Sequence, residues 1–212
     1  MGIEEVRTAP YRIETDRLVI RCYDPGPDAP LLKDAIDSSH EHLLPWMPWM
    51  QFEPQTLAEK VDLLRAFRAG FDADENYAYG IFTRDESRQL GGAGLHPRGG
   101  PASLEIGYFI RADALRQGYA TEVTAVLARA AVDVCGVKRV DVQIDPANER
   151  SVGIPRKLGF TLEGTLRRRL PPKEEGGERR DSMLFTMLAE ELPHSPCAAY
   201  GYTAYDVAGN KL

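Results

Sequence analysis

The stretch Glu105-Ile-Gly-Tyr-Phe-Ile110, followed after a short polar turn by Leu115-Arg-Gln-Gly-Tyr-Ala-Thr-Glu122, indicates the fold of this chain. An apolar run typical of a strand ends at Ile110, and a glycine-containing turn then opens into an amphipathic helix. The first N–H groups of a helix lack intrahelical partners and point outward, and the helix dipole adds positive charge there. Gly118 lets a ligand approach the backbone closely, so this turn predicts a binding site for phosphate groups.

Neither a G-x-G-x-x-G fingerprint nor a G-x-x-x-x-G-K-[ST] loop occurs in the sequence, which argues against the common nucleotide-binding motifs. Residues Leu115 to Ala120 instead resemble the Q/R-x-x-G-x-G/A loop that binds the acyl-CoA pyrophosphate in GNAT acetyltransferases. Five further segments share that resemblance: Thr15-Asp-Arg-Leu-Val-Ile-Arg21, His42-Leu-Leu-Pro-Trp-Met-Pro-Trp49, Asp145-Pro-Ala-Asn-Glu-Arg-Ser151, Arg156-Lys-Leu-Gly-Phe160 and Glu163-Gly-Thr-Leu-Arg167. In this order they resemble the RimJ/RimL branch, which acetylates ribosomal-protein N-termini, over about residues 10–190.

The resemblance implies an α/β (α+β) fold, with a mixed, mainly antiparallel sheet of about seven strands flanked by helices, and acetyl-CoA as cosubstrate. It implies that the edge of the strand Tyr108-Phe-Ile110 pairs with the pantetheine amides, and that a backbone N–H near Phe109 or Ile110 stabilises the oxyanion. The residues expected to contact the donor are Tyr108, Phe109, Ile110, Arg116, Gln117, Gly118, Tyr119, Ala120, Thr121, Asn148 and Ser151.

Composition favours one soluble globular domain. The 212 residues are enough for one full core, and 43% hydrophobic with 27% charged residues is ordinary for such a domain. No apolar run approaches the roughly 18 residues of a membrane span, and the N-terminal residues show no signal-peptide pattern. Three widely spaced cysteines suggest neither a disulfide framework nor a zinc site, so we expect a cytoplasmic protein without a metal.

The formal net charge of −6 argues against a nucleic-acid partner. Arg167-Arg-Arg169 and Arg179-Arg180 are the only basic clusters, and we interpret them as solvated hairpin ends. An acidic surface suits a cationic acceptor, because it steers positive charge toward the protein. A homodimer stays open as the assembly.

Apolar periodicity predicts the elements. Helices are expected at 30–40, 56–71, from Gly118 to about Cys135, and from Asn148 to Leu158. Strands are expected at Arg17–Arg21, Tyr77–Thr83, Gln89–His96, Ser103–Ile110, Arg139–Ile144, Phe160–Arg169 and Asp181–Ala189. The strand–helix–strand order around Gly118 predicts a right-handed parallel crossover. Residues 1–190 are expected to form a single GNAT-like domain, and 191–212 an extension of unknown role, either an added edge strand or a swapped arm.

Direct acetyl transfer to an amine needs a held donor, a neutral amine, an oxyanion donor and a departing thiolate, without a covalent enzyme nucleophile. The resemblance makes Glu105 the expected base and a substrate-binding residue, because the Leu-Glu-Ile-Gly-Tyr strand lines the acceptor site in the family. Partial burial makes a carboxylate a stronger base. The alternative is a surface carboxylate paired with Arg or Lys, and the alternation of apolar residues around Glu105 does not decide which face it occupies.

Ser151 is the expected acid for the thiolate. In the family, the Asn of the Asn-x-x-Ser pattern lies against the pantetheine arm, which assigns that place to Asn148. Many GNAT enzymes carry a Tyr acid four residues before the Gly of the Gly-Phe pair, but Pro155 stands there, so Ser151 inherits the role if any residue has it. Helix capping by Asn148 and Ser151 is an equally weighted reading, and both can hold.

Trp46 and Trp49, within Pro45-Trp-Met-Pro-Trp49, form a stiff apolar segment suited to gripping the acceptor, with core packing as the competing interpretation. Some RimL proteins place a proposed catalytic Glu where this chain has Leu170, so that role is not transferred. Glu174, Glu175 and Glu178 in the following loop are interpreted as solvated rather than as contacts to a cationic acceptor. None of the four histidines shows metal-ligand spacing.

The leading hypothesis is therefore an N-acetyltransferase acting on a protein or peptide N-terminal α-amine. At pH 7 about a tenth of an α-amine is neutral, against about one in 2,500 for a lysine amine, which favours the former. The alternatives are acetylation of a small-molecule amine or antibiotic, and a non-catalytic acyl-CoA-binding regulatory module.

Overall fold

The computed structural model describes residues 8–173 and 176–212. Its strands are β1 (Arg12–Glu14), β2 (Leu18–Cys22), β3 (Tyr77–Thr83), β4 (Gln89–His96), β5 (Ser103–Ile110), β6 (Arg139–Ile144), β7 (Thr161–Leu170), β8 (Arg180–Leu188) and β9 (Thr203–Tyr205). Its α-helices are α1 (Pro25–Asp37), α2 (His40–Leu43), α3 (Leu57–Asp72), α4 (Tyr119–Asp133) and α5 (Glu149–Leu158). Short 3-10 turns are η1 (Pro48–Phe52), η2 (Ala112–Ala114), η3 (Leu192–His194) and η4 (Pro196–Ala199).

The strands of the described residues form one sheet in the order β7-β8-β6-β5-β4-β3-β2-β1-β9. Every neighbouring pair is antiparallel except β5 and β6, which are parallel and joined through α4. The predicted mixed, mainly antiparallel sheet flanked by helices is thus confirmed, as is the parallel crossover. Four strands, from β3 to β6, have the predicted bounds.

The sheet has nine strands in the described chain rather than about seven, because β1 and β9 add to one edge. Both span three residues, which is too short for a period-2 pattern to be visible in the sequence. Helix α1 begins at Pro25 rather than at residue 30. Proline is favoured in the first helical turn, where its missing N–H has no cost, so the Pro-rich stretch starts the helix instead of preceding it.

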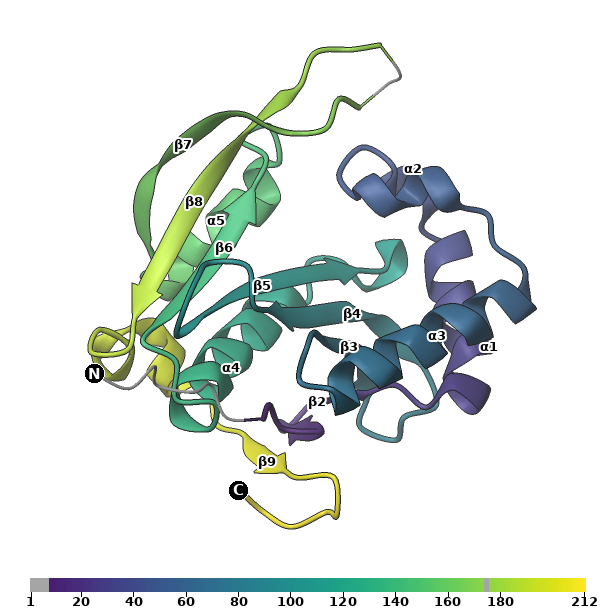
Figure 1. Ribbon diagram of the computed structural model, residues 1–212, viewed down its shortest axis with the longest axis horizontal. Coiled ribbons are helices and arrows are strands. Elements are labelled where there is room, and N and C mark those ends of the chain that lie inside the picture. Colours follow the sequence, from purple (N-terminus) through teal and green to yellow (C-terminus); the bar gives the residue numbers. More distant parts are fainter. Residues whose placement is uncertain (1–7, 174–175) are drawn as a thin grey trace.

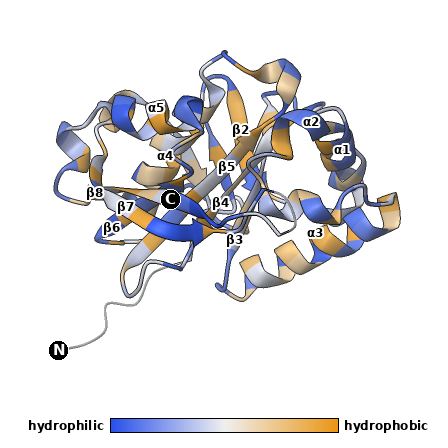
Figure 2. Ribbon diagram, turned by 90° about the horizontal axis from the view of Figure 1, so that it is seen from above, coloured by the Kyte–Doolittle hydropathy of each residue, from blue (hydrophilic) through white to orange (hydrophobic). Residues whose placement is uncertain are grey.

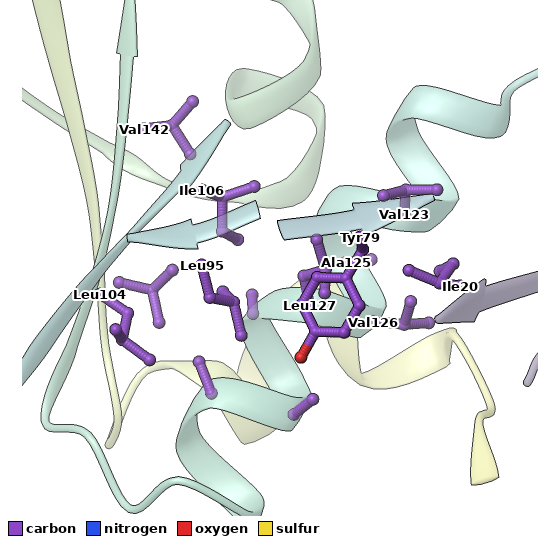
Figure 3. Packing of buried hydrophobic residues seen from close by; sticks show 14 of the residues in the cluster. Ile20, Tyr79, Leu95, Leu104, Ile106, Val123, Ala125, Val126, Leu127 and Val142 are labelled. Carbon is purple, nitrogen blue, oxygen red and sulfur yellow. The ribbon is translucent and has the colours of Figure 1, made fainter. Parts of the chain in front are cut away.

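Helix α4 packs on one face of the sheet. Its residues Val123, Val126 and Leu127 are fully buried among apolar side chains of β2 to β6, as Figure 3 shows for Leu104 and Ile106. Alanine at other buried positions of α4 lets the helix approach the strands closely. The predicted apolar face of this helix is therefore the main core contact.

Helices α1 and α3 pack together on the opposite face of the sheet, beside β2, β3 and β4, and Figure 1 shows them at one end of that face. Hydrophilic and hydrophobic residues alternate along α3 in Figure 2, as expected of a helix with one solvated side. A capping box of Thr56 and Glu59 starts α3. On this face, β5, β6 and β8 carry polar side chains.

Part of the segment after β8 returns to the sheet and adds a strand to its edge. Strand β9 pairs antiparallel with β1, and the Arg129 guanidinium of α4 donates to the Tyr200 carbonyl at 2.6 Å. The Tyr202 hydroxyl donates to Asp133 at 3.1 Å. Residues 191–212 thus provide the added edge strand rather than an arm that leaves the domain, whereas the domain boundary at 190 stays a prediction.

In the described part of the chain, no helix combines the length and the apolar character needed to cross a membrane.

Candidate active site

Strands β5 and β6 separate after three residue pairs. Their parallel register runs only from Ser103 opposite Arg139 to Glu105 opposite Asp141, and Figure 1 shows the two strands diverging beyond it. Arg111 donates its N–H to the Leu90 carbonyl on the β4 side. Because N–H directions alternate along a strand, the N–H groups of Tyr108 and Ile110 point toward the β6 side. This free strand edge can pair with an extended amide-containing ligand.

The N-terminus of α4 follows this edge. Gly118 has a φ of 82°, and Arg116 has a φ of 61°, so the turn uses the left-handed region twice. Within the described chain, the backbone N–H groups of residues 116–121 donate to no protein group. Unpaired donors and a helix dipole favour an anion at this place, and binding of the donor pyrophosphate by Gln117, Tyr119, Ala120 and Thr121 stays a prediction.

The buried carboxylate of Glu122 holds the turn before α4 in place through contacts inside the protein. Glu122, in the first turn of α4, accepts hydrogen bonds from the Thr15 hydroxyl at 2.6 Å and from Arg17 Nε at 2.8 Å. Arg17 also donates from Nη1 to the Gln117 carbonyl at 2.9 Å, and its guanidinium lies 4.8 Å from the centre of the Tyr119 ring. Thr15 and Arg17 belong to a segment that carries the family resemblance, but this role was not predicted. The available signal was an acidic residue, Glu122, in the first turn of a predicted helix.

Replacing Gly118 with Val is expected to weaken CoA binding by about tenfold or more, because a β-branched residue in the left-handed region costs more than 1–2 kcal/mol and reshapes the turn. Titration calorimetry with CoA measures this effect. Gly209→Val is the matched control, since Gly209 has a φ of 80° in a distant turn, and a Cβ there meets no atom within 4 Å while one at Gly118 meets only Arg17 Nη2 at an ordinary 3.6 Å. Equal CoA affinity in the two variants would contradict the assignment of the turn.

Asn148 caps α5, since its side-chain oxygen accepts from the Ser151 N–H at 3.2 Å. The capping interpretation therefore holds for Asn148, and a donor contact by its amide nitrogen stays a prediction. The Ser151 hydroxyl has no hydrogen-bond partner among the described residues. Ser151 also accepts, through its carbonyl, a 3.5 Å hydrogen bond from the Tyr108 hydroxyl. Burial raises the pKa of Tyr108 well above its ordinary value, so this phenol stays protonated.

The Tyr108 hydroxyl thus reaches the backbone of Ser151 in the first turn of α5. Tyr108 was predicted on the donor strand, and its hydroxyl is a second candidate acid beside that of Ser151. The side chain of Pro155, at the family's usual Tyr position, is buried within α5.

Glu105 lies on the sheet face opposite α4, because its neighbours Leu104 and Ile106 are buried in the α4 core. Its side chain is 12% exposed. Gln143 of β6 donates to Glu105 Oε2 at 2.8 Å, and Arg98 lies 3.4 Å from Oε1. The burial of its neighbours thus shows which sheet face Glu105 occupies, a question that the alternation of apolar residues in the sequence did not decide. The alternative of pairing with Arg is also realised, through a side chain of Arg98 that is 63% exposed.

The two tryptophans stand at the other end of this face. Trp49 packs against Phe109, with ring centroids 5.5 Å apart, and both border the core beneath α1 and α3. The Lys173 ammonium lies over the Trp46 ring, 4.2 Å from its centre. Arg180 donates to the Pro45 carbonyl at 3.4 Å, so the β7–β8 hairpin contacts this segment. The packing interpretation therefore holds for Trp49, which is half-buried, and contact of either tryptophan with the acceptor stays a prediction.

Other predicted residues lie apart from this arrangement. Glu178 is exposed, in agreement with a solvated loop, whereas Glu174 and Glu175 lie outside the described residues. Leu170 ends β7. Arg179 donates to the carbonyls of Arg168 and Arg169 at 2.9 Å, which cross-links the hairpin. The absence of a nucleic-acid partner stays a prediction. Among the described residues, no group of three or more His, Cys, Asp or Glu side chains could hold a metal ion.

The model of the "Acetyltransferase (GNAT) domain" family matches residues 17–161, more than half of the chain. The chain belongs to this GNAT family. The uncharacterized N-acetyltransferase YoaA of Bacillus subtilis (strain 168) is 27% identical over 114 residues, which cover 53% of this chain. That match spans 64% of YoaA, less than two thirds of its length.

Solved GNAT structures have the same fold. Mycobacterium smegmatis RimJ in complex with CoA-disulfide superposes with a TM-score of 0.77 at 23% identity, over 89% of this chain and 92% of that one. RimL, the ribosomal L7/L12 α-N-protein acetyltransferase in complex with coenzyme A, gives 0.71 at 18% identity, over 82% and 95%. The predicted resemblance to RimJ/RimL is confirmed as membership of the GNAT family with RimJ and RimL among its structural neighbours.

Proposed function

We propose that this protein is an acetyl-CoA-dependent N-acetyltransferase that transfers the acetyl group directly to an N-terminal α-amine of a peptide or protein. The observation that carries this proposal is the divergence of β5 from β6, with the free N–H groups of the α4 turn at one end and Glu105 on the sheet face opposite α4. GNAT family membership supports it, and so do the structures of RimJ with CoA-disulfide and of RimL with coenzyme A.

The residues present fit an acyl-CoA. The α4 turn offers main-chain donors for the pyrophosphate, and the free edge at Tyr108 and Ile110 offers pairing for the pantetheine amides. Acetyl-CoA supplies the activated thioester. We assign the Ile110 N–H to the thioester oxygen, on which negative charge develops, and leave the other groups of this edge to the pantetheine amides.

The reaction requires two proton transfers, one from the acceptor amine and one to the departing thiolate. Glu105 accepts the proton that the amine loses as its nitrogen bonds to the acetyl carbon, either directly or through a water. The C–S bond breaks, and the thiolate receives a proton from the hydroxyl of Ser151 or from that of Tyr108, which donates to the Ser151 carbonyl in the absence of substrate. Holding both substrates side by side makes a covalent enzyme intermediate unnecessary.

Replacing Ser151 with Ala is expected to lower turnover by less than about tenfold, because a CoA thiol is acidic enough to leave with modest help. Steady-state rates of thiol release measure this loss, with Tyr108→Phe as the parallel variant. A small loss in the first variant and a large one in the second would move the acid role to Tyr108. A hundredfold loss in Ser151→Ala, with folding intact, would contradict the expectation.

The acceptor is tested with one peptide that carries both an open N-terminus and an internal lysine. Fragmentation mass spectrometry of the product locates the acetyl group. We expect it on the N-terminal nitrogen, because far more of that amine is neutral near pH 7. Acetylation of the lysine alone would contradict the α-amine assignment. Transfer only to small amines or antibiotics would make detoxification the function.

A further inference from the structure

His96 is a polar residue that has no role in the proposed mechanism, although it lies near Glu105. It ends β4 and stands directly opposite Glu105 of β5 in the antiparallel register. Directly opposed residues project from the same face of a sheet, with Cβ atoms about 5 Å apart. The imidazole of His96 and the carboxylate of Glu105 therefore share the sheet face opposite α4.

Two glycines set the direction of the imidazole. A Cβ on Gly94 would lie 2.5 Å from both Cε1 and Nε2 of His96, and a Cβ on Gly107 would lie 3.2 Å from Nε2. Neither glycine has a positive φ, so both are needed for space rather than for backbone conformation. The ring thus lies along the sheet surface, with Nε2 carried from position 96 toward Gly107. Gly107 lies on β5 between Glu105, the proposed base, and Phe109 of the proposed donor edge.

A second contact fixes the tautomer. Nδ1 of His96 lies 2.5 Å from the side-chain oxygen of Asn76, so Nδ1 carries the proton and donates it. Burial, with a smaller contribution from the Arg98 charge, lowers the pKa of His96 to about 4. The ring is consequently neutral near pH 7, and Nε2 presents a lone pair. Among the described residues no group donates to Nε2.

We infer that His96, held by Asn76, is an amine-positioning residue whose Nε2 accepts one N–H of the acceptor while Glu105 receives the other. This inference rests on the proposed function and narrows its substrate class. A neutral primary amine has two N–H hydrogens and satisfies both acceptors. A neutral secondary amine has one and leaves a desolvated acceptor unpaired. The site therefore selects primary over secondary amines.

The kinetic test compares two peptides that differ only in an N-terminal alanine or N-methylalanine. The wild-type protein is expected to prefer alanine by about tenfold or more in kcat/KM, since one unpaired buried acceptor costs about 1–3 kcal/mol. His96→Phe keeps a flat ring over the two glycines but removes the acceptor. It should raise the peptide KM and reduce the preference several-fold, with the KM for acetyl-CoA unchanged. His96→Gln, whose amide oxygen can accept, should keep part of the preference.

The matched control is His194→Phe, at an exposed position in η3, which should leave every parameter unchanged. If N-methylalanine were rejected only because its methyl group clashes, His96→Phe would keep the wild-type preference. That result, or an unchanged peptide KM, would overturn the inference.

A binding measurement separates this inference from the proposed function. Nitrogen NMR of histidine-labelled protein, in the complex with CoA and the alanine peptide, reports on His96 without turnover. We expect a proton on Nδ1, an unprotonated Nε2, and a change in the Nε2 resonance when peptide is added. A proton on Nε2 or no response to peptide would overturn the role of His96. Absence of transfer to any amine would instead contradict the proposed function.

Discussion

Replacing Glu105 with Gln is expected to lower turnover by about tenfold or more, while CoA affinity stays at the wild-type value. Glutamine has nearly the same shape and can still pair with Gln143, but it cannot accept the proton that the amine loses. Because Glu105 lies on the sheet face opposite α4, away from the α4 turn, donor binding should not depend on its charge. Thiol-release kinetics and calorimetry with CoA measure the two quantities separately.

The control is Glu163→Gln, an exposed carboxylate on β7, which should leave turnover unchanged. Unchanged turnover in Glu105→Gln would remove Glu105 as the base. A parallel loss of CoA affinity and turnover would point to a structural effect through Gln143 and Ser182, since Ser182 donates to Gln143 at 3.3 Å.

Replacing Lys60 with Met is expected to reduce the free energy of unfolding by about 3 kcal/mol or more. Lys60 is fully buried in α3 and pairs with Glu53, whose side chain is 3% exposed. Methionine fills the alkyl volume but leaves the Glu53 carboxylate buried without its cation. Glu53 follows η1, so the pair also fixes the segment that carries Trp49. Urea unfolding, followed by far-UV circular dichroism, measures the loss.

The double variant Lys60→Met with Glu53→Gln is the control, because it removes both charges together. It should be more stable than Lys60→Met alone, since the cost comes from the unpaired carboxylate rather than from the missing attraction. A single variant that loses less than about 1 kcal/mol, as exposed ion pairs do, would contradict the importance of this pair.

The sequence predicted the parts of the fold that local patterns encode. Strands β3 to β6 show apolar residues bounded by turn residues, and the helix after Gly118 shows helical spacing, so their positions follow. β1 was not predicted, and β9 was expected only as one of two readings of residues 191–212, because three-residue strands form only when a neighbour pairs with them.

The parts of the candidate site that lie within a sequence motif could be predicted. The parts that depend on contacts between segments far apart in the sequence could not. The face of Glu105 depends on which side α4 covers, which alternation alone does not show. The contacts of Thr15 and Arg17 with Glu122 join residues more than 100 positions apart. His96 carried a readable signal, because Gly94 lies two residues before it on the same face of a strand, yet metal spacing was the only role considered for it.

The central claim is that this fold moves an acetyl group from acetyl-CoA to an amine. Its most direct test is free-thiol release by the wild-type protein, with open-N-terminus peptides, N-blocked lysine peptides and small amines as acceptors. The account predicts release with the open-N-terminus peptides, matched by equal amounts of N-terminally acetylated product. Tight CoA binding with no thiol release for any amine would contradict it, and would leave a regulatory acyl-CoA-binding module as the function.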